Sequence, residues 1–153
     1  QRVLAIDTAR ETLDIAESRV NSSNVSFAVG DGYDIAVPVP RCTAAFAGFW
    51  WSHIPHVRIA AFLNGLHAAL EPGSTVVFID NRFVVGSSTP IRECDDDGNT
   101  WQKRFLADGS SHRILKNFPS RDELLGIFAP LATNPRFHEW QHYWALEYTT
   151  AAN

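Results

Sequence analysis

The chain has 153 residues, of which 45% are hydrophobic and 20% are charged, and its net charge is −4. This length and balance are typical of one soluble globular domain and argue against a chain that is disordered throughout. The Lys and Arg residues are dispersed, so neither a nucleic acid nor an anionic membrane is expected as a partner. Two cysteines far apart in the sequence favour reduced thiols in a cytoplasmic protein over a disulfide framework.

A strand followed by a helix opens the chain. Residues 3–6 form a continuous apolar run, which is the pattern of a strand buried on both faces of a parallel sheet. Thr8 and Glu11 have the spacing of a capping box. We therefore expect a helix to begin there and to end before the polar residues 21–24.

The same alternation continues further along the chain. Residues 25–29 and 44–50 are apolar strand candidates, residues 57–70 carry apolar side chains at helical spacing, and residues 75–80 again form a buried strand candidate. This order predicts an α/β fold, with a Rossmann-like, mostly parallel sheet and helices on both faces.

Residues 82–118 interrupt this alternation. Their first part, up to residue 100, contains Gly, Pro and an acidic run and predicts a surface loop. The remainder predicts a two-stranded ribbon that turns at Asp108 and Gly109. We interpret the whole stretch as an insertion in a single domain covering residues 1–153.

A short helix and an aromatic segment end the chain. Ser120 and Glu123 form a second capping box ahead of the helix. Residues 136–150 predict two strands with a tight reversal near His142. No helix separates these strands, so they must pair as an antiparallel hairpin.

Acidic residues follow the first two predicted strands, and ligands bind beyond the carboxyl ends of parallel strands. Asp7 can accept hydrogen bonds from both hydroxyls of a ribose, or it can cap the next helix. Asp31, between Gly30 and Gly32, can accept from the amine of an adenine, or it can belong to an ordinary turn. The residues themselves leave both alternatives open.

Four segments of the chain resemble the class I S-adenosylmethionine-dependent methyltransferases, particularly those that act on small molecules. The segments are VLAIDTARETLDIAESR (3–19), VSFAVGDGYDI (25–35), FAGFWWSHIP (46–55) and LHAALEPGSTVVFIDN (66–81). The resemblance implies S-adenosylmethionine as the cofactor. Asp7 would bind its ribose, Asp31 would meet its adenine amine, and Phe49 with Trp50 would lie beside its methionine part. The cofactor-binding residues implied in this way are Asp7, Thr8, Asp31, Gly32, Phe49 and Trp50.

The sequence departs from the family at its beginning. The family's first strand and glycine-rich loop precede the segment that opens at residue 3, and neither occurs here. In the family that strand lies in the middle of the sheet, so without it the neighbouring strands have unpaired backbone groups or are forced together. The chain also starts at Gln1 and contains no Met. We therefore expect it to be N-terminally incomplete.

Methyl transfer to a hydroxyl or an amine needs a group that takes up a proton. His53, just after the strand candidate 44–50, is our candidate base, and a structural histidine is the alternative. His56 is close in sequence, but no third ligand is near, so no metal site is expected. Polar and aromatic neighbours at the strand ends are candidates for acceptor binding, with a core position as the alternative for the Trp. They are Trp51, Asp80, Asn81 and Arg82.

The sequence thus predicts transfer of a methyl group from S-adenosylmethionine to a small-molecule acceptor. One alternative is a methyltransferase-like module that binds without catalysis. A second is a fragment of an NAD(P)-dependent oxidoreductase, which also places an acid after its second strand. The sequence predicts neither the acceptor atom nor the oligomeric state.

Overall fold

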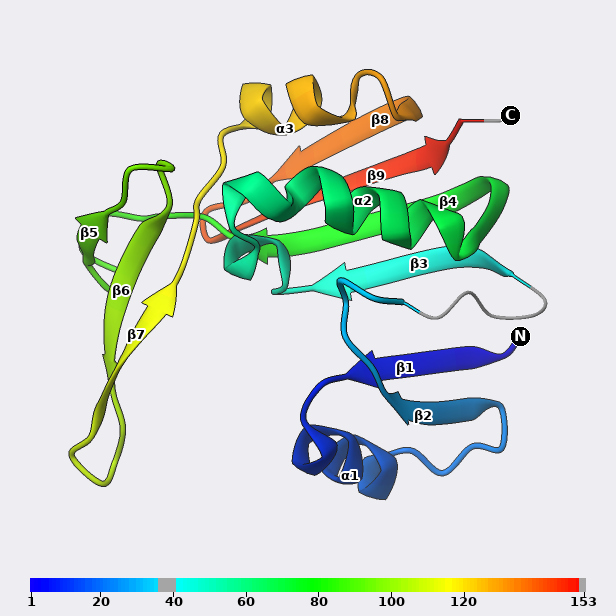
Figure 1. Ribbon diagram of the computed structural model, residues 1–153, viewed down its shortest axis with the longest axis horizontal. Coiled ribbons are helices and arrows are strands. Elements are labelled where there is room, and N and C mark those ends of the chain that lie inside the picture. Colours follow the sequence, from blue (N-terminus) through cyan, green and yellow to red (C-terminus); the bar gives the residue numbers. More distant parts are fainter. Residues whose placement is uncertain (36–40, 152–153) are drawn as a thin grey trace.

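The computed structural model describes residues 1–35 and 41–151 and has an α/β architecture (Figure 1). In chain order its elements are β1 (Val3–Asp7), α1 (Arg10–Arg19), β2 (Val25–Val29), β3 (Cys42–Gly48), the 3-10 turns η1 (Trp51–His53) and η2 (His56–Arg58), α2 (Ile59–Ala68), β4 (Leu70–Asn81), β5 (Ile91–Cys94), β6 (Thr100–Phe105), β7 (Ser111–Leu115), α3 (Arg121–Phe128), β8 (Ala132–Glu139) and β9 (Tyr143–Thr150).

The strands of the described residues form three sheets instead of one mostly parallel sheet. One is the parallel pair β1-β2, the second is a mixed sheet in the order β3-β4-β9-β8, and the third is the antiparallel ribbon β5-β6-β7. In the mixed sheet β3 and β4 are parallel, whereas β9 is antiparallel to both β4 and β8. The predicted α/β class is therefore confirmed, and the pairs β1-β2 and β3-β4 are parallel, but the strands do not join into one sheet in the described residues.

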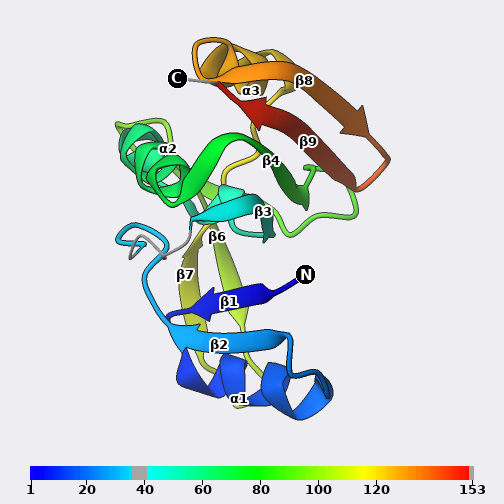
Figure 2. The ribbon, with the colours of Figure 1, turned by 90° about the vertical axis from the view of Figure 1, so that its right-hand side faces the viewer.

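The strand β1 is not buried on both faces as its apolar run predicted. Val3 is 52% exposed, Leu4 44% and Ile6 41%. The reason is its place in the fold. It pairs with β2 on one edge only, and Figures 1 and 2 place its other edge beside β3, with which it forms no ladder in the described residues.

The two predicted capping boxes have different outcomes. At α3, Glu123 N–H donates to Ser120 Oγ at 3.2 Å and Glu123 Oε2 accepts from Ser120 N–H at 2.7 Å, so that box is confirmed. At α1 the box is absent, because the N-cap residue is Ala9 instead of Thr8 and no side chain caps it. The helix begins one residue later than the box requires.

The core lies between the mixed sheet and the two helices α2 and α3. Alternate residues of β4 and β9 point into it, including Phe78 and Trp144, and Trp51 packs between these strands and α3. The other face of the same sheet is open in the described residues, where Phe46 of β3 is 72% exposed. The two helices thus cover one face of this sheet, and α1 packs on β1 and β2.

The insertion and the C-terminal hairpin follow the predicted pattern with one addition. The strands β6 and β7 pair antiparallel and turn at Asp108 and Gly109, and β8 and β9 form the terminal hairpin. The strand β5, within the predicted loop, adds a third member to the ribbon. No helix in the described part of the chain is long and apolar enough to span a bilayer.

Candidate functional site

The carboxyl ends of β1, β2, β3 and β4 all point toward the side of the molecule from which the ribbon extends (Figure 1). Parallel strands share this polarity, so the residues that follow them meet at one edge. We call this edge the mouth. The predicted cofactor and acceptor residues follow these four strands.

Asp7 and Asp31 each use one carboxylate oxygen locally. Asp7 Oδ1 accepts from Ala9 N–H at 2.8 Å, which helps the chain enter α1, and Asp31 Oδ1 accepts from Tyr33 N–H at 2.9 Å in a turn. In the described residues no hydrogen bond reaches Oδ2 of either carboxylate. One oxygen of each carboxylate thus stabilises a turn, which for Asp7 precedes α1 without capping it, and the second oxygen of each remains able to accept from a ligand.

Gly32 and Trp50 are brought together at the mouth. A Cβ built on Gly32 would lie 3.1 Å from Cζ2 of Trp50, so glycine lets the backbone and the indole lie close together without a shift of the ring. Tyr33 packs against the same ring with centroids 5.6 Å apart. The indole Nε1 of Trp50 is buried and has no acceptor in the described residues. A buried N–H without an acceptor is uncommon in a folded protein.

Phe49 projects into the mouth from a strained turn. Its φ is 57°, a left-handed conformation that is unusual for a bulky residue, and its N–H donates to the Ile79 carbonyl at 2.8 Å. The side chain is half exposed and meets the ring of Tyr143, at the start of β9, edge to face. Thr8 is exposed and makes no cap.

His53 is the last residue of η1, which follows β3 in the sequence, and its side chain is half-buried. Burial lowers the pKa of its imidazole, and the Lys116 ammonium lowers it further. The Asp80 carboxylate and a hydrogen bond to the Leu115 backbone oppose this shift, and the Arg104 guanidinium adds to it. The net effect leaves His53 uncharged at neutral pH, the form in which an imidazole accepts a proton.

Asp80, whose charge acts on His53, is fully buried, so an acceptor molecule cannot reach its carboxylate. Its Oδ2 accepts from Ser52 N–H at 2.8 Å, and its Oδ1 accepts from Ser52 Oγ at 2.9 Å and from Asn81 N–H at 2.7 Å. Lys116 Nζ donates to Ser52 Oγ at 2.7 Å and lies 3.4 Å from Asp80 Oδ1. The acid at the end of β4 therefore forms a buried polar network, which corrects our expectation that it orients the acceptor.

The other three acceptor candidates also have structural partners. Trp51 is 2% exposed and is a core residue, which corrects its assignment to the mouth. Asn81 donates through its side chain to Asp80 at 3.2 Å. Arg82 donates to the Trp140 carbonyl at 2.6 Å and forms an ion pair with Glu139 at 3.0 Å, so it holds the tip of the β8-β9 hairpin.

Sequence reasoning missed the residues that connect the ribbon to the mouth. Asn117 N–H donates to the Ser52 carbonyl at 2.8 Å, and its side-chain amide donates to the Ile54 carbonyl at 3.1 Å. Asn99 accepts from His56 N–H at 2.8 Å. The available signal was a Lys-Asn pair inside the apolar segment ILKNF, because polar residues flanked by apolar ones are buried only with partners.

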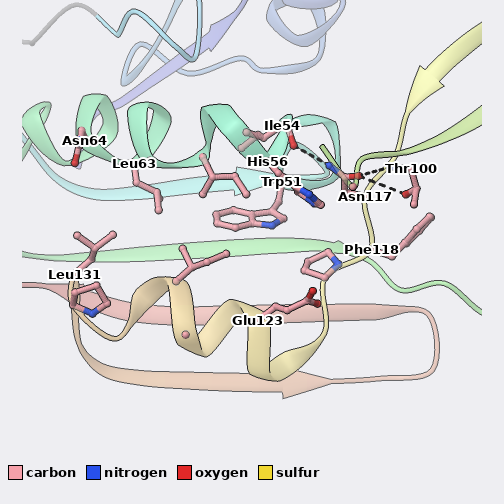
Figure 3. A pocket seen from close by; sticks show the side chains of 17 residues that line it. Trp51, Ile54, His56, Leu63, Asn64, Thr100, Asn117, Phe118, Glu123 and Leu131 are labelled. Atoms are coloured by element: carbon pink, nitrogen blue, oxygen red, sulfur yellow. Dashed lines mark hydrogen bonds between the residues drawn. The ribbon is translucent and has the colours of Figure 1, made fainter. Parts of the chain in front are cut away.

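A hollow of about 850 Å³ lies between α2 and α3 (Figure 3), and neither Asp7 nor Asp31 lines it. Trp51, Leu63 and Ile127 give it an apolar lining, and Asn117 and Glu123 lie at its ribbon end. Of the residues predicted for the site, only Trp51 borders it. The hollow is therefore separate from the mouth.

Comparisons with known proteins give one clear result. No known protein-family profile and no curated protein sequence matches the chain. The solved structure of DhpI bound to SAH is 27% identical, with a TM-score of 0.76 over 100% of this chain and 68% of that one. A second DhpI structure, a complex with SAM and HEP, is 26% identical with a TM-score of 0.77.

Two more distant structures share the fold. A SAM-dependent methyltransferase from Methanosarcina mazei has a TM-score of 0.70 at 12% identity, over 99% of this chain and 83% of that one. The glycopeptide N-methyltransferase MtfA bound to SAH has a TM-score of 0.67 at 11% identity, over 97% and 73%. The chain therefore has the fold of the class I S-adenosylmethionine-dependent methyltransferases.

Proposed function

We propose that this chain is a methyltransferase domain that binds S-adenosylmethionine and transfers its methyl group to a small molecule. The observation that carries the proposal is the pair of carboxylates at the ends of β1 and β2, each with one oxygen free of local hydrogen bonds, in a fold shared with DhpI, MtfA and related methyltransferases. The DhpI structures are complexes with SAH or SAM, and the MtfA structure is a complex with SAH. Neither alternative function has comparable support.

The residues fit this cofactor by their chemistry. Asp7 would accept hydrogen bonds from the ribose hydroxyls, and Asp31 would accept from the adenine amine. The buried indole N–H of Trp50 would gain an acceptor that it lacks in the described residues. Phe49 would provide an aromatic ring against the ligand, and Gly32 lets the Trp50 indole lie close to the backbone there. When bound, the cofactor supplies an electrophilic methyl group attached to a sulfonium.

His53 would complete the reaction on the acceptor side. With S-adenosylmethionine held by these residues as the methyl donor, the acceptor oxygen or nitrogen would gain the methyl group and its proton would pass to the uncharged imidazole of His53. Most of the rate gain comes from holding the two reactants in line, and the base adds about 100-fold to 10,000-fold. Neither a nucleic acid nor a membrane is part of this proposal, and the cytoplasmic location stays a prediction.

Calorimetric titration with S-adenosylmethionine and SAH tests the cofactor. We expect binding by the wild-type protein and at least tenfold weaker binding by Asp7→Ala, about 1.4 kcal/mol, because charge-assisted hydrogen bonds to the ribose are lost. Asp7→Asn keeps an acceptor for Ala9 N–H, so it separates cofactor binding from helix entry. Asp14→Ala removes an exposed carboxylate from α1 and is the control.

The outcomes distinguish the candidate functions. An unchanged dissociation constant in both Asp7 variants would remove Asp7 from the site. Binding without methyl transfer to any hydroxyl or amine in a small-molecule panel would indicate the non-catalytic module. If transfer occurs, His53→Gln should lower kcat by about 100-fold or more and leave the cofactor dissociation constant unchanged.

A further inference from the structure

Lys116 and Asn117, at the end of the ribbon, contact the residues on both sides of His53. Lys116 Nζ donates to the Ser52 side chain at 2.7 Å, and Asn117 donates to the backbone carbonyls of Ser52 and Ile54. Figure 3 shows the Asn117 amide between Ile54 and Thr100, at the end of the ribbon. The backbone on both sides of His53 is thus held by groups from an element more than 60 residues further along the chain.

The charge of Lys116 is unnecessary for holding Ser52 in place. A neutral donor would satisfy Ser52 Oγ, and burying an ammonium costs several kcal/mol before any partner is counted. Lys116 is nevertheless 6% exposed, and its partner Asp80 is 0% exposed. The cation compensates the buried Asp80 carboxylate, whose Oδ1 lies 3.4 Å from Lys116 Nζ, and a charge buried in this way also acts on other titratable groups nearby.

The neighbour that responds to this charge is His53. The charged groups that face its imidazole are Lys116, Asp80 on β4, and Arg104 on β6. Among them Lys116 has the strongest effect, and it opposes protonation of the ring. Asp80 acts in the opposite sense, but Ser52 and Asn81 share its oxygens.

We propose that Lys116 is a positioning residue for the methyl transfer described above: it fixes the turn that carries His53 and keeps the imidazole uncharged and ready to accept a proton. The role of Lys116 in catalysis rests on the proposed function. Its contacts with the turn that carries His53 rest on the buried network alone. It also gives the insertion a role, since the ribbon brings Lys116 to the mouth.

The test is an NMR titration of the His53 imidazole in the free protein, with the resonance assigned by its loss in His53→Gln. In Lys116→Met the pKa of His53 should rise, because the opposing cation is gone and Asp80 remains. Lys116→Arg keeps a cation and should leave the pKa near the wild-type value. Lys103→Met makes the same substitution at an exposed lysine of β6 and should change nothing.

A second variant covers the case in which Lys116→Met does not fold. Lys116→Met with Asp80→Asn removes both charges and leaves no buried ion unpaired. Asp80→Asn alone is its reference: the pKa of His53 should be higher in the double variant than in Asp80→Asn, because only the double variant lacks the opposing cation. A pKa in the folded double variant equal to or below that in Asp80→Asn would overturn the proposal.

Kinetics separate this inference from the proposed function. In an active enzyme the acid limb of the kcat profile should move to higher pH in Lys116→Met, with KM for S-adenosylmethionine unchanged. An unmoved acid limb would overturn the positioning role. A raised pKa of His53 in Lys116→Met, found in a protein that transfers no methyl group, would refute the proposed function. It would still support the electrostatic effect of Lys116 on His53.

Discussion

Phe49 and Tyr143 meet edge to face with ring centroids 6.0 Å apart, and the contact is made from a backbone conformation that phenylalanine rarely adopts. At a φ of 57° a side chain costs roughly 1–2 kcal/mol that glycine does not incur. Phe49→Gly and Phe49→Ala both remove the ring contact. We therefore expect Phe49→Gly to be the more stable of the two by about 1 kcal/mol, measured by urea unfolding.

The control for this comparison is an exposed helical position. At Ala60 in α2 the usual order should return, with Ala60→Gly less stable than wild type by about 1 kcal/mol. If glycine were the less stable residue at position 49 as well, the turn after β3 would not be strained.

The pH dependence of stability should depend on His67. Its Nε2 lies 2.7 Å from the buried Tyr148 hydroxyl, and burial lowers the pKa of the imidazole. Its pKa is thus lower in the folded protein than in the unfolded chain, so its contribution is fully present above about pH 6.5 and is lost as the pH falls. The free energy of unfolding should drop between pH 7 and pH 5, and should drop less in His67→Gln.

The effect of His67 must be separated from that of His53, because burial also lowers the pKa of His53. The variant His53→Gln should remove a different part of the same pH dependence, and the two parts should add, because His53 lies in η1 and His67 lies in the last turn of α2. A pH dependence that is identical in wild type and His67→Gln would contradict the prediction.

The buried pair Asp80 and Lys116 should show strong coupling in a double-mutant cycle. Removing Lys116 alone leaves an uncompensated buried carboxylate, so Lys116→Met should destabilise the protein by about 3–5 kcal/mol. The double variant with Asp80→Asn should cost less than the sum of the single changes. Urea unfolding of the four proteins gives the coupling energy, and simple additivity would show that the charges do not interact.

The capping box at the start of α3 should contribute measurably to stability. Ser120→Ala should cost about 1 kcal/mol, because the Glu123 backbone N–H loses its acceptor. Hydrogen bonds from Ser120 lower the pKa of Glu123, so its contribution is present above the ordinary carboxyl pKa and is lost as the pH falls through the lower folded value. The difference in Tm between wild type and Ser120→Ala should therefore narrow in acid without vanishing, because the hydrogen bond from Glu123 N–H to Ser120 Oγ does not titrate.

Much of the fold could be predicted from the sequence because local patterns define its helices and strands. The apolar runs of β2, β3 and β4, the Ser120 capping box and the aromatic hairpin all have signals within a few residues. The start of β4 was misplaced for a tertiary reason. Leu70 pairs with Cys42, and the strand bulges past Gly73, at a φ of 76°, before the regular ladder begins.

The candidate site was less predictable because its polar groups find partners through tertiary contacts. The acid after β4 looked like the acids after β1 and β2, yet Asp80 is buried by Ser52 and Lys116, and Lys116 is 36 residues away in the sequence. Trp51 and Trp50 are adjacent, but only the first enters the core, and no periodic pattern separates them. Strand order and burial at an edge are set by pairing, which one sequence does not display.

The division of the strands into separate ladders has a consequence for how the molecule opens. Asp7 and Asp31 belong to the β1-β2 pair, whereas His53 follows the four-stranded sheet, and no backbone ladder joins the two in the described residues. Segments without shared hydrogen bonds can lose their order one at a time. The amides of β1 and β2 should therefore exchange with deuterium sooner than those of β4 and β9. A ligand that contacts both the β1-β2 pair and the four-stranded sheet would hold them together, and its binding would slow the exchange of the β1 and β2 amides.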